Sequence, residues 1–248
     1  MEEALTEFKS FTNDYLEYGE MITLKINHTL RVVELCENIA KSLNLNDEEI
    51  FIAKIIGLLH DIGRFEQWKV YKTYKDIDSI DHANLGVEIL KKNNYLRKFI
   101  KDDKYDDIIL KSIYYHNKHT IPSDLDEKTT MFAKLIRDAD KIDILYIYTI
   151  KQIDLPLDNE FTNDTYESLL KENTISREDI KTKTDRLAIT FGFIFDINYK
   201  YSFEYLKDKK YFDTIVDIYK EKLNNEVFRN QLEEIRKIIN NYIEVKIC

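Results

Sequence analysis

The chain has 248 residues, of which 33% are charged and 44% are hydrophobic, and its formal net charge is −9. Its 13 Phe and 17 Tyr, together with only 5 Gly and 2 Pro, exclude a disordered chain and disfavour an all-β fold, which needs frequent turn residues. An acidic chain without a basic block is also poorly suited to a nucleic-acid polymer, whose binding requires that phosphates be neutralised.

Apolar residues recur at helical spacing from the beginning of the chain. The first clear run covers residues 22–43. Asn46 and Glu49 then have the spacing of a capping box, which predicts the start of a second helix. That helix is expected to end near Gly63, because glycine often follows the last helical turn.

The helical pattern continues to the end of the sequence. Asp81 or Ser79 can cap a third helix. Later helices are expected over about 105–117, 126–151 and 224–245. There is no fixed repeat, and residues 153–163 are only a weak candidate boundary. We therefore predict one all-α domain over residues 1–248.

The sequence shows no sign of secretion or membrane insertion. The first ten residues contain acids and no apolar run, so no signal peptide is expected. Apolar runs such as 144–150 are too short to cross a bilayer. Cys36 and Cys248 form no metal-binding pair, and Cys36 is expected in the core. These features predict a cytoplasmic protein without a membrane partner.

Six polar residues lie on or beside faces that the apolar pattern predicts to be buried. They are His28, His60, Asp61, His82, His116 and Asp140. Burial of an imidazole or a carboxylate is unfavourable unless the group is paired or binds a metal. One such histidine is most simply bonded to a backbone carbonyl. Four histidines and two aspartates on five helices are better explained by a shared metal centre.

The number and type of these residues predict the kind of centre. Six ligands exceed what one catalytic metal with open positions uses, so we expect two metals bridged by one carboxylate. Imidazole and carboxylate ligands without a thiolate favour Fe, Mn, Co or Zn over Mg alone.

The order of these residues resembles the HD superfamily of metal-dependent phosphohydrolases. The resemblance rests on "NHTLRVVELCENIA", "GLLHDIGRFEQ", "DHANLGVEIL" and "LIRDADKIDIL", and it covers about residues 20–150. It implies an HD-domain helical bundle as the motif-bearing core. His82 and His116 resemble the additional ligands of the family's dinuclear, six-ligand branch.

The resemblance also implies a role for each ligand. Asp61 would bridge the two metals. His28, His60 and Asp140 would complete one site, and His82 and His116 would complete the other. The implied activity is hydrolysis of a phosphate ester or anhydride by a hydroxide that the metals generate. The implied substrate is a small phosphorylated molecule that is nucleotide-like.

Five further residues are candidates for catalysis or substrate binding. Arg64 follows Asp61 by one turn and Lys141 adjoins Asp140, so both are placed to bind a phosphate, although either could form a surface salt bridge instead. Trp68 and Tyr71 lie among lysines and could stack on a base, or they could pack a short amphipathic helix on the core. His119 is a substrate contact or a solvated loop residue.

Two other functions stay open for this ligand set. Diiron oxygenases that resemble HD proteins use the same ligands, and an HD module can bind without catalysing. Whether the chain is a monomer or a homodimer is also open.

The region after the core has its own apolar signal. Residues 187–197 read "LAITFGFIFDI", which requires a partner because exposed apolar surface of this size is rare. We therefore expect residues 151–248 to form a helical extension packed on the HD core.

Overall fold

The computed structural model describes residues 1–248, except for the side chain of Arg177. The chain is all-α, as predicted, and no strand occurs in the part that is described. The helices are α1 (Glu2–Asn13), α2 (Glu20–Ser42), α3 (Asp47–Leu59), α4 (Ile62–Tyr71), α5 (His82–Lys91), α6 (Asp106–Tyr115), α7 (Glu127–Thr149), α8 (Asn163–Leu170), α9 (Asp185–Gly192), α10 (Lys200–Lys209), α11 (Tyr211–Lys222) and α12 (Glu226–Ile247). Short 3-10 helices span Leu16–Tyr18, Asp76–Asp78, Lys92–Lys98, Arg177–Asp179 and Phe193–Asp196.

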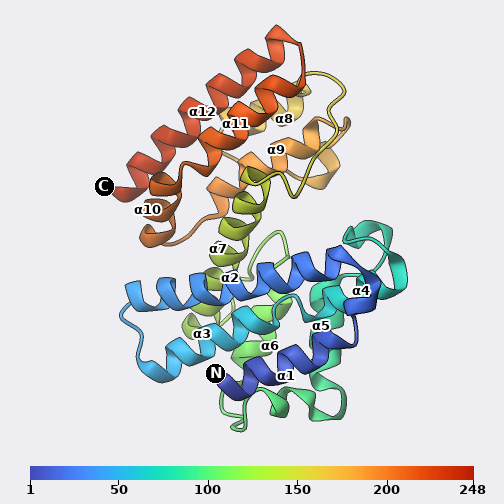
Figure 1. Ribbon diagram of the computed structural model, residues 1–248. Coiled ribbons are helices and arrows are strands. Elements are labelled where there is room, and N and C mark those ends of the chain that lie inside the picture. The colour runs from blue at the N-terminus through green and yellow to red at the C-terminus, as the bar shows by residue number, and fades with distance from the viewer. The chain divides into compact units, whose positions relative to one another are not determined.

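The chain divides into two compact units, Met1–Asp140 and Lys141–Cys248, and the division falls within α7 (Figure 1). The sequence predicted a core of about 20–150 with the remainder packed on it as one domain. That arrangement stays a prediction.

Helix α3 is the central helix of the N-terminal unit, because apolar residues occupy nearly all of its sides. Its buried residues are Ile52, Ala53, Ile55, Ile56, Gly57, Leu58 and Leu59. It begins at the predicted capping box, in which the Asn46 side chain accepts from the Glu49 backbone N–H and the Glu49 carboxylate accepts from the Asn46 N–H. The capping therefore sets where α3 starts.

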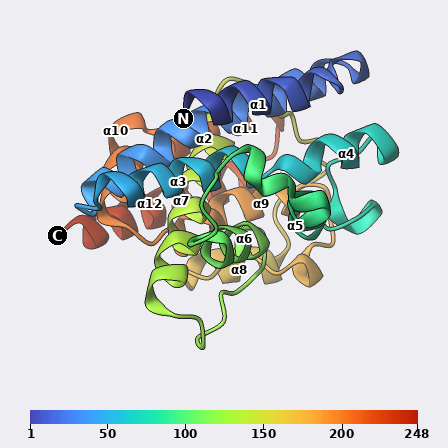
Figure 2. The same ribbon diagram turned by 90° about the horizontal axis from the view of Figure 1, so that it is seen from below.

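Helices α2 and α3 lie side by side in both views (Figure 1, Figure 2). Val32, Leu35 and Ile39 of α2 are buried, as their spacing predicted. A Cβ at Gly57 would lie 2.9 Å from the Sγ of Cys36, so only glycine allows this close approach. Cys36 is a free, buried cysteine, which confirms its expected place in the core.

A new helix begins just after α3, which ends at Leu59 rather than near Gly63. Gly63 lies instead in the first turn of α4, and a Cβ there would lie 2.2 Å from the backbone O of His82 and 2.7 Å from the backbone N of Gly86. The predicted end was late because this glycine permits a close contact between helices instead of ending one. The contact brings the start of α4 against the start of α5.

The C-terminal unit has an aromatic core of its own. Helix α12 packs on α10 and α11, and α8 packs on α9. The apolar stretch 187–197 forms α9 and the following 3-10 helix, and the ring of Phe191 lies 6.4 Å from that of Phe161 and 6.5 Å from that of Phe212. Partners within the unit thus cover part of this stretch.

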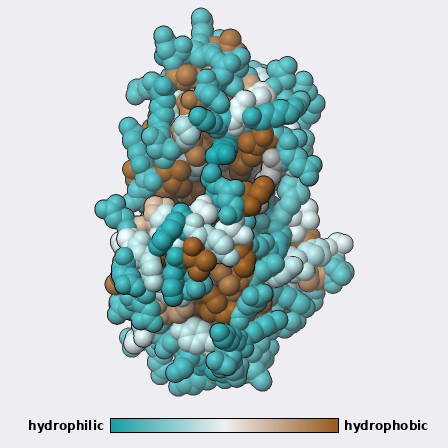
Figure 3. Space-filling view, turned by 90° about the vertical axis from the view of Figure 1, so that its right-hand side faces the viewer, coloured by the Kyte–Doolittle hydropathy of each residue, from teal (hydrophilic) through white to brown (hydrophobic). Residues whose placement is uncertain are grey.

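The surface is mostly hydrophilic on the face shown in Figure 3, where apolar side chains gather in patches. The large apolar side chains with the greatest exposure are Ile77, Val245, Val70 and Val227. Among the described residues, no helix has the length and apolar character needed to cross a membrane.

A buried carboxylate connects the loops of the C-terminal unit. Asp185 accepts hydrogen bonds from the backbone N–H groups of Thr162 (2.9 Å), Lys181 (3.1 Å) and Thr182 (3.0 Å) and from the Thr165 hydroxyl (2.7 Å). Burial raises the pKa of Asp185, but these donors outweigh it and lower that pKa below its usual value. The ionised form therefore stabilises this part of the unit.

We expect Asp185→Ala to destabilise the protein by about 2–4 kcal/mol, because three backbone N–H groups lose their acceptor. Chemical denaturation followed by circular dichroism measures the change. Asp208→Ala is the control, since Asp208 is exposed on α10 and should change stability by about 0.5 kcal/mol or less. Equal stability of Asp185→Ala and the wild type would contradict this role for the carboxylate.

Candidate metal centre

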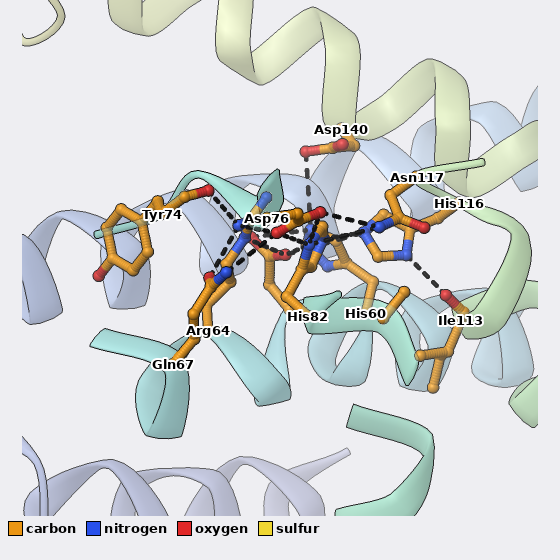
Figure 4. A network of polar contacts seen from close by, with 12 residues as sticks. His60, Arg64, Gln67, Tyr74, Asp76, His82, Ile113, His116, Asn117 and Asp140 are labelled. Carbon is orange, nitrogen blue, oxygen red and sulfur yellow. Dashed lines mark hydrogen bonds and ion pairs between the residues drawn. The ribbon is translucent and has the colours of Figure 1, made fainter. Parts of the chain in front are cut away.

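The structure brings the six predicted ligands together in the N-terminal unit. His28 comes from the middle of α2, and His60 and Asp61 occupy the junction between α3 and α4. His82 begins α5, His116 follows α6, and Asp140 comes from α7. The four histidines and Asp61 are buried, and Asp140 is largely so. Figure 4 shows four of these residues, His60, His82, His116 and Asp140, turned toward one another.

The two carboxylate oxygens of Asp61 face two different sets of histidines. Oδ2 lies 3.5 Å from His28 Nε2 and 3.6 Å from His60 Nε2. Oδ1 lies 3.4 Å from His82 Nε2 and 3.7 Å from His116 Nε2. Asp140 Oδ1 completes the first set, 3.2 Å from His28 and 3.7 Å from His60. One carboxylate is thus shared by two groups of possible ligands.

Hydrogen bonds on the outer side of three imidazoles define their tautomers. His60 Nδ1 donates to the Gly57 carbonyl at 2.8 Å, and His116 Nδ1 donates to the Ile113 carbonyl at 2.6 Å. His82 Nδ1 donates to Asp76 at 2.8 Å. Because Nδ1 carries the proton, Nε2 of each neutral ring presents its lone pair to the centre.

The positions of these lone pairs show whether the residues could hold a cation. The Nε2 atoms of His82 and His116 are 3.0 Å apart, and those of His28 and His60 are 3.3 Å apart. Where Nδ1 holds the proton, nitrogen lone pairs that face each other repel, and a cation between them removes the repulsion. His28, His60 and Asp140 can offer ligand atoms within 4.8 Å of one another, as can His60, Asp61 and His116. The donor set fits divalent transition metals.

Electrostatics keep the two acidic ligands charged, and burial keeps two of the basic ligands, His82 and His116, neutral. Burial alone would raise the pKa of Asp61, but the Lys25 ammonium and the surrounding histidines hold it well below its usual range. The pKa of Asp140 is likewise well below its usual range, because His28 and His60 outweigh burial. Burial lowers the pKa of His82 to about 3 and also lowers that of His116. Metals bind these deprotonated forms.

We expect the metal-free protein to lose stability as the pH falls below about 6.5, the pKa of histidine in an unfolded chain. The unfolded state then takes up protons that buried His82 and His116 do not. Each such histidine costs about 1.4 kcal/mol per pH unit until its folded-state pKa is reached. Denaturation in EDTA between pH 5 and pH 8 measures the slope, and a flat profile below pH 6.5 would contradict the neutral imidazoles.

Lys25 is a residue of the centre that the sequence analysis missed. Its Nζ lies 2.7 Å from Asp61 Oδ2 and 5.4 Å from the centroid of the Tyr74 ring, and only 12% of its side chain is exposed. Lys25 precedes His28 by three positions, so both lie on one face of α2. That spacing was the available signal, but surface lysines occur at such positions too often for it to stand out.

We expect Lys25→Met to destabilise the metal-free protein by about 3–5 kcal/mol, because it leaves the buried Asp61 carboxylate without its ammonium partner. Metal ions at the same carboxylate should reduce this loss. Thermal unfolding with EDTA and with added Mn²⁺ measures both effects.

The matched control for that experiment is Lys41→Met on the same helix. Lys41 is 57% exposed and pairs with Glu37 on the surface, so it should contribute about 0.5 kcal/mol or less. An equal loss from both variants, or a loss that metal does not reduce, would show that Lys25 is not a partner of the buried carboxylate.

The five residues predicted to contact the substrate lie in different surroundings. Arg64 Nη1 donates to Asp76 at 2.9 Å, and its Nε lies 3.5 Å from Asp61 Oδ1. Trp68 Nε1 donates to the Tyr18 carbonyl at 3.1 Å. Tyr71 and His119 are exposed. Lys141 pairs with Asp196 at 2.8 Å within the C-terminal unit. The substrate roles of all five stay predictions.

Comparison with known proteins identifies the family. Residues 26–145 match the family model of the HD domain, and this range contains all six predicted ligands. Residues 26–145 therefore belong to the HD domain family, as the motifs of the sequence indicated. The assignment to the dinuclear branch stays a prediction.

Curated relatives match about half of the chain. The chain is 30% identical to Ribonuclease Y of Ureaplasma parvum over 125 residues, which are 50% of this chain and 20% of that protein. It is 30% identical to Ribonuclease Y of Malacoplasma penetrans over 115 residues (46% and 19%) and 29% identical to that of Listeria monocytogenes over 125 residues (50% and 18%). The chain thus spans about a fifth of the length of these relatives. No solved structure gives a significant match.

Proposed function

We propose that the chain is a phosphohydrolase that holds two divalent transition metal ions and hydrolyses a phosphate ester or anhydride of a small nucleotide-like molecule. The observation that carries the proposal is the sharing of one buried carboxylate, Asp61, by two sets of imidazoles. His28, His60, Asp140 and Asp61 Oδ2 would hold one ion. His82, His116 and Asp61 Oδ1 would hold the other.

The chain's own charges support an anionic substrate. Two such ions would lower the pKa of a shared water and neutralise charge on the transferring phosphoryl group. Asp61 and Asp140 offset only part of the charge of two divalent ions, and Lys25 contributes a further positive charge. The loaded centre would therefore attract a phosphate. Lys141 remains a proposed contact for it. The hydrogen bonds of Arg64 to Asp76 and to the Tyr74 carbonyl favour a positioning role for that residue instead.

The comparisons support a nucleotide as the substrate, and the composition of the chain supports a small molecule over a polymer. The relatives are ribonucleases by name, which favours a substrate with a nucleotide phosphodiester. The net charge of −9 disfavours a long polymer. Short RNA is therefore the second substrate class to test. A cytoplasmic location and the number of chains in the functional protein stay predictions.

We expect the purified protein to release phosphate or a nucleotide when Mn, Co, Fe, Ni or Mg is added separately to mono-, di- and polyphosphate nucleotides or to short RNA. Asp61→Ala should bind neither ion and lose hydrolysis, because both sets of histidines share this carboxylate. Elemental analysis and chromatography of the products measure the two effects.

Asp107→Ala is the control, since Asp107 is exposed on α6 and should leave metal content and rate unchanged. Two ions with hydrolysis of nucleotides support the proposal. Visible absorption with oxygen consumption and no hydrolysis would favour the oxygenase alternative. Intact metals with neither reaction would favour a binding module.

A further inference from the structure

We propose that Asp76 is the residue that positions His82, and that Arg64 acts through Asp76 instead of contacting the substrate. Asp76 lies outside the six ligands. The inference rests on the proposed function in one respect, because His82 belongs to the proposed second metal site.

Asp76 contacts His82 on the side away from the centre. Its Oδ1 and Oδ2 lie 2.9 Å and 2.8 Å from His82 Nδ1, while His82 Nε2 lies 3.4 Å from Asp61 Oδ1 (Figure 4). A carboxylate can only accept, so it selects the Nδ1–H tautomer and directs the Nε2 lone pair inward. His60 and His116 donate to backbone carbonyls for the same purpose. Of these three histidines, only His82 is oriented by a side chain.

Three side chains hold the Asp76 carboxylate in place. Arg64 Nη1 donates to Oδ1 at 2.9 Å, Gln67 Nε2 donates to Oδ1 at 3.0 Å, and Asn117 Nδ2 donates to Oδ2 at 3.2 Å. The Asp76 side chain is only 9% exposed, so these donors replace the water that an ionised carboxylate needs. Arg64 and Gln67 come from α4, and Asn117 follows α6. The carboxylate is thus held from two elements.

Hydrogen bonds also hold the backbone on either side of Asp76. Arg64 Nη1 donates to the Tyr74 carbonyl, and the Tyr74 hydroxyl donates to the Met21 carbonyl of α2 at 2.8 Å. Gln67 Nε2 also donates to the Ile80 carbonyl at 2.9 Å. The segment between α4 and α5 therefore has a defined position at both ends of its 3-10 helix. Arg64 contributes to this position through the same nitrogen that contacts Asp76.

The first test measures metal affinity. Titration of the metal-free protein with Mn²⁺ should give two binding steps, and the step that His82→Ala removes belongs to the second site. Asp76→Asn should weaken that step by about 10- to 100-fold and leave the other unchanged, as is typical when the carboxylate behind a histidine ligand is lost. Asp78→Asn is the matched control, because Asp78 lies two residues further on and is 56% exposed. Equal affinities in Asp76→Asn and the wild type would overturn the proposal.

The second test needs no metal and separates this inference from the proposed function. In the metal-free wild type, nitrogen NMR of the ring should show His82 as the Nδ1–H tautomer. An amide can donate as well as accept, so Asp76→Asn should bring in the Nε2–H tautomer. An unchanged tautomer would overturn the positioning role. If the wild type binds no metal but the tautomer still shifts in Asp76→Asn, the proposed function alone would be overturned.

The variant Arg64→Lys distinguishes a role in positioning Asp76 from a contact with the substrate. It also tests the proposal if Asp76→Asn fails to fold. A lysine cannot reproduce the planar contacts to Asp76, Gln67 and the Tyr74 carbonyl. If Arg64 acts through Asp76, this variant should weaken the second metal step. A raised KM with both metal steps unchanged would return Arg64 to a substrate contact and overturn that part of the proposal.

Discussion

The buried carboxylate of Asp61 is the constraint on which the N-terminal unit depends. A charge in this position is tolerated only when cations or donors surround it, and the fold supplies Lys25 together with imidazoles from four segments. The helices must approach closely enough for this. Gly63 allows it at the start of α4, where a Cβ would lie 2.2 Å from the backbone O of His82 and would force the two segments apart.

The outer hydrogen bonds are as important as the ligands themselves. His60 and His116 each donate to a carbonyl three residues earlier, so the helix that carries the ring also orients it. His82 begins α5 and has no preceding helical turn, so Asp76 from a neighbouring segment takes that role. The orientation of His82 therefore depends on a loop, whereas the orientations of His60 and His116 depend on the geometry of their own helices. This difference explains why Arg64, Gln67 and Asn117 converge on Asp76.

Much of the fold could be predicted because its signals are local. The capping box at Asn46, the Asp81 cap of α5 and the apolar stripe of α2 all lie within a few residues of the features they define. The end of α3 was predicted too late, because Gly63 is a contact between helices and not a helix terminator. Trp68 could be read as a base-stacking residue from its neighbours, and only the structure shows its N–H bonded to the Tyr18 carbonyl.

The sequence by itself determined the helical class and the six residues of the candidate centre, because buried polar residues at helical spacing are visible in one dimension. Which oxygen of Asp61 faces which histidine was decided only by the tertiary structure. The same holds for the places of Lys25 and Asp76, whose partners lie 36 and 6 positions away along the chain. A charged surface residue and a charged residue that serves a buried site look alike in sequence. The packing of helices distinguishes them, because it determines which charges lose their water and must find a partner.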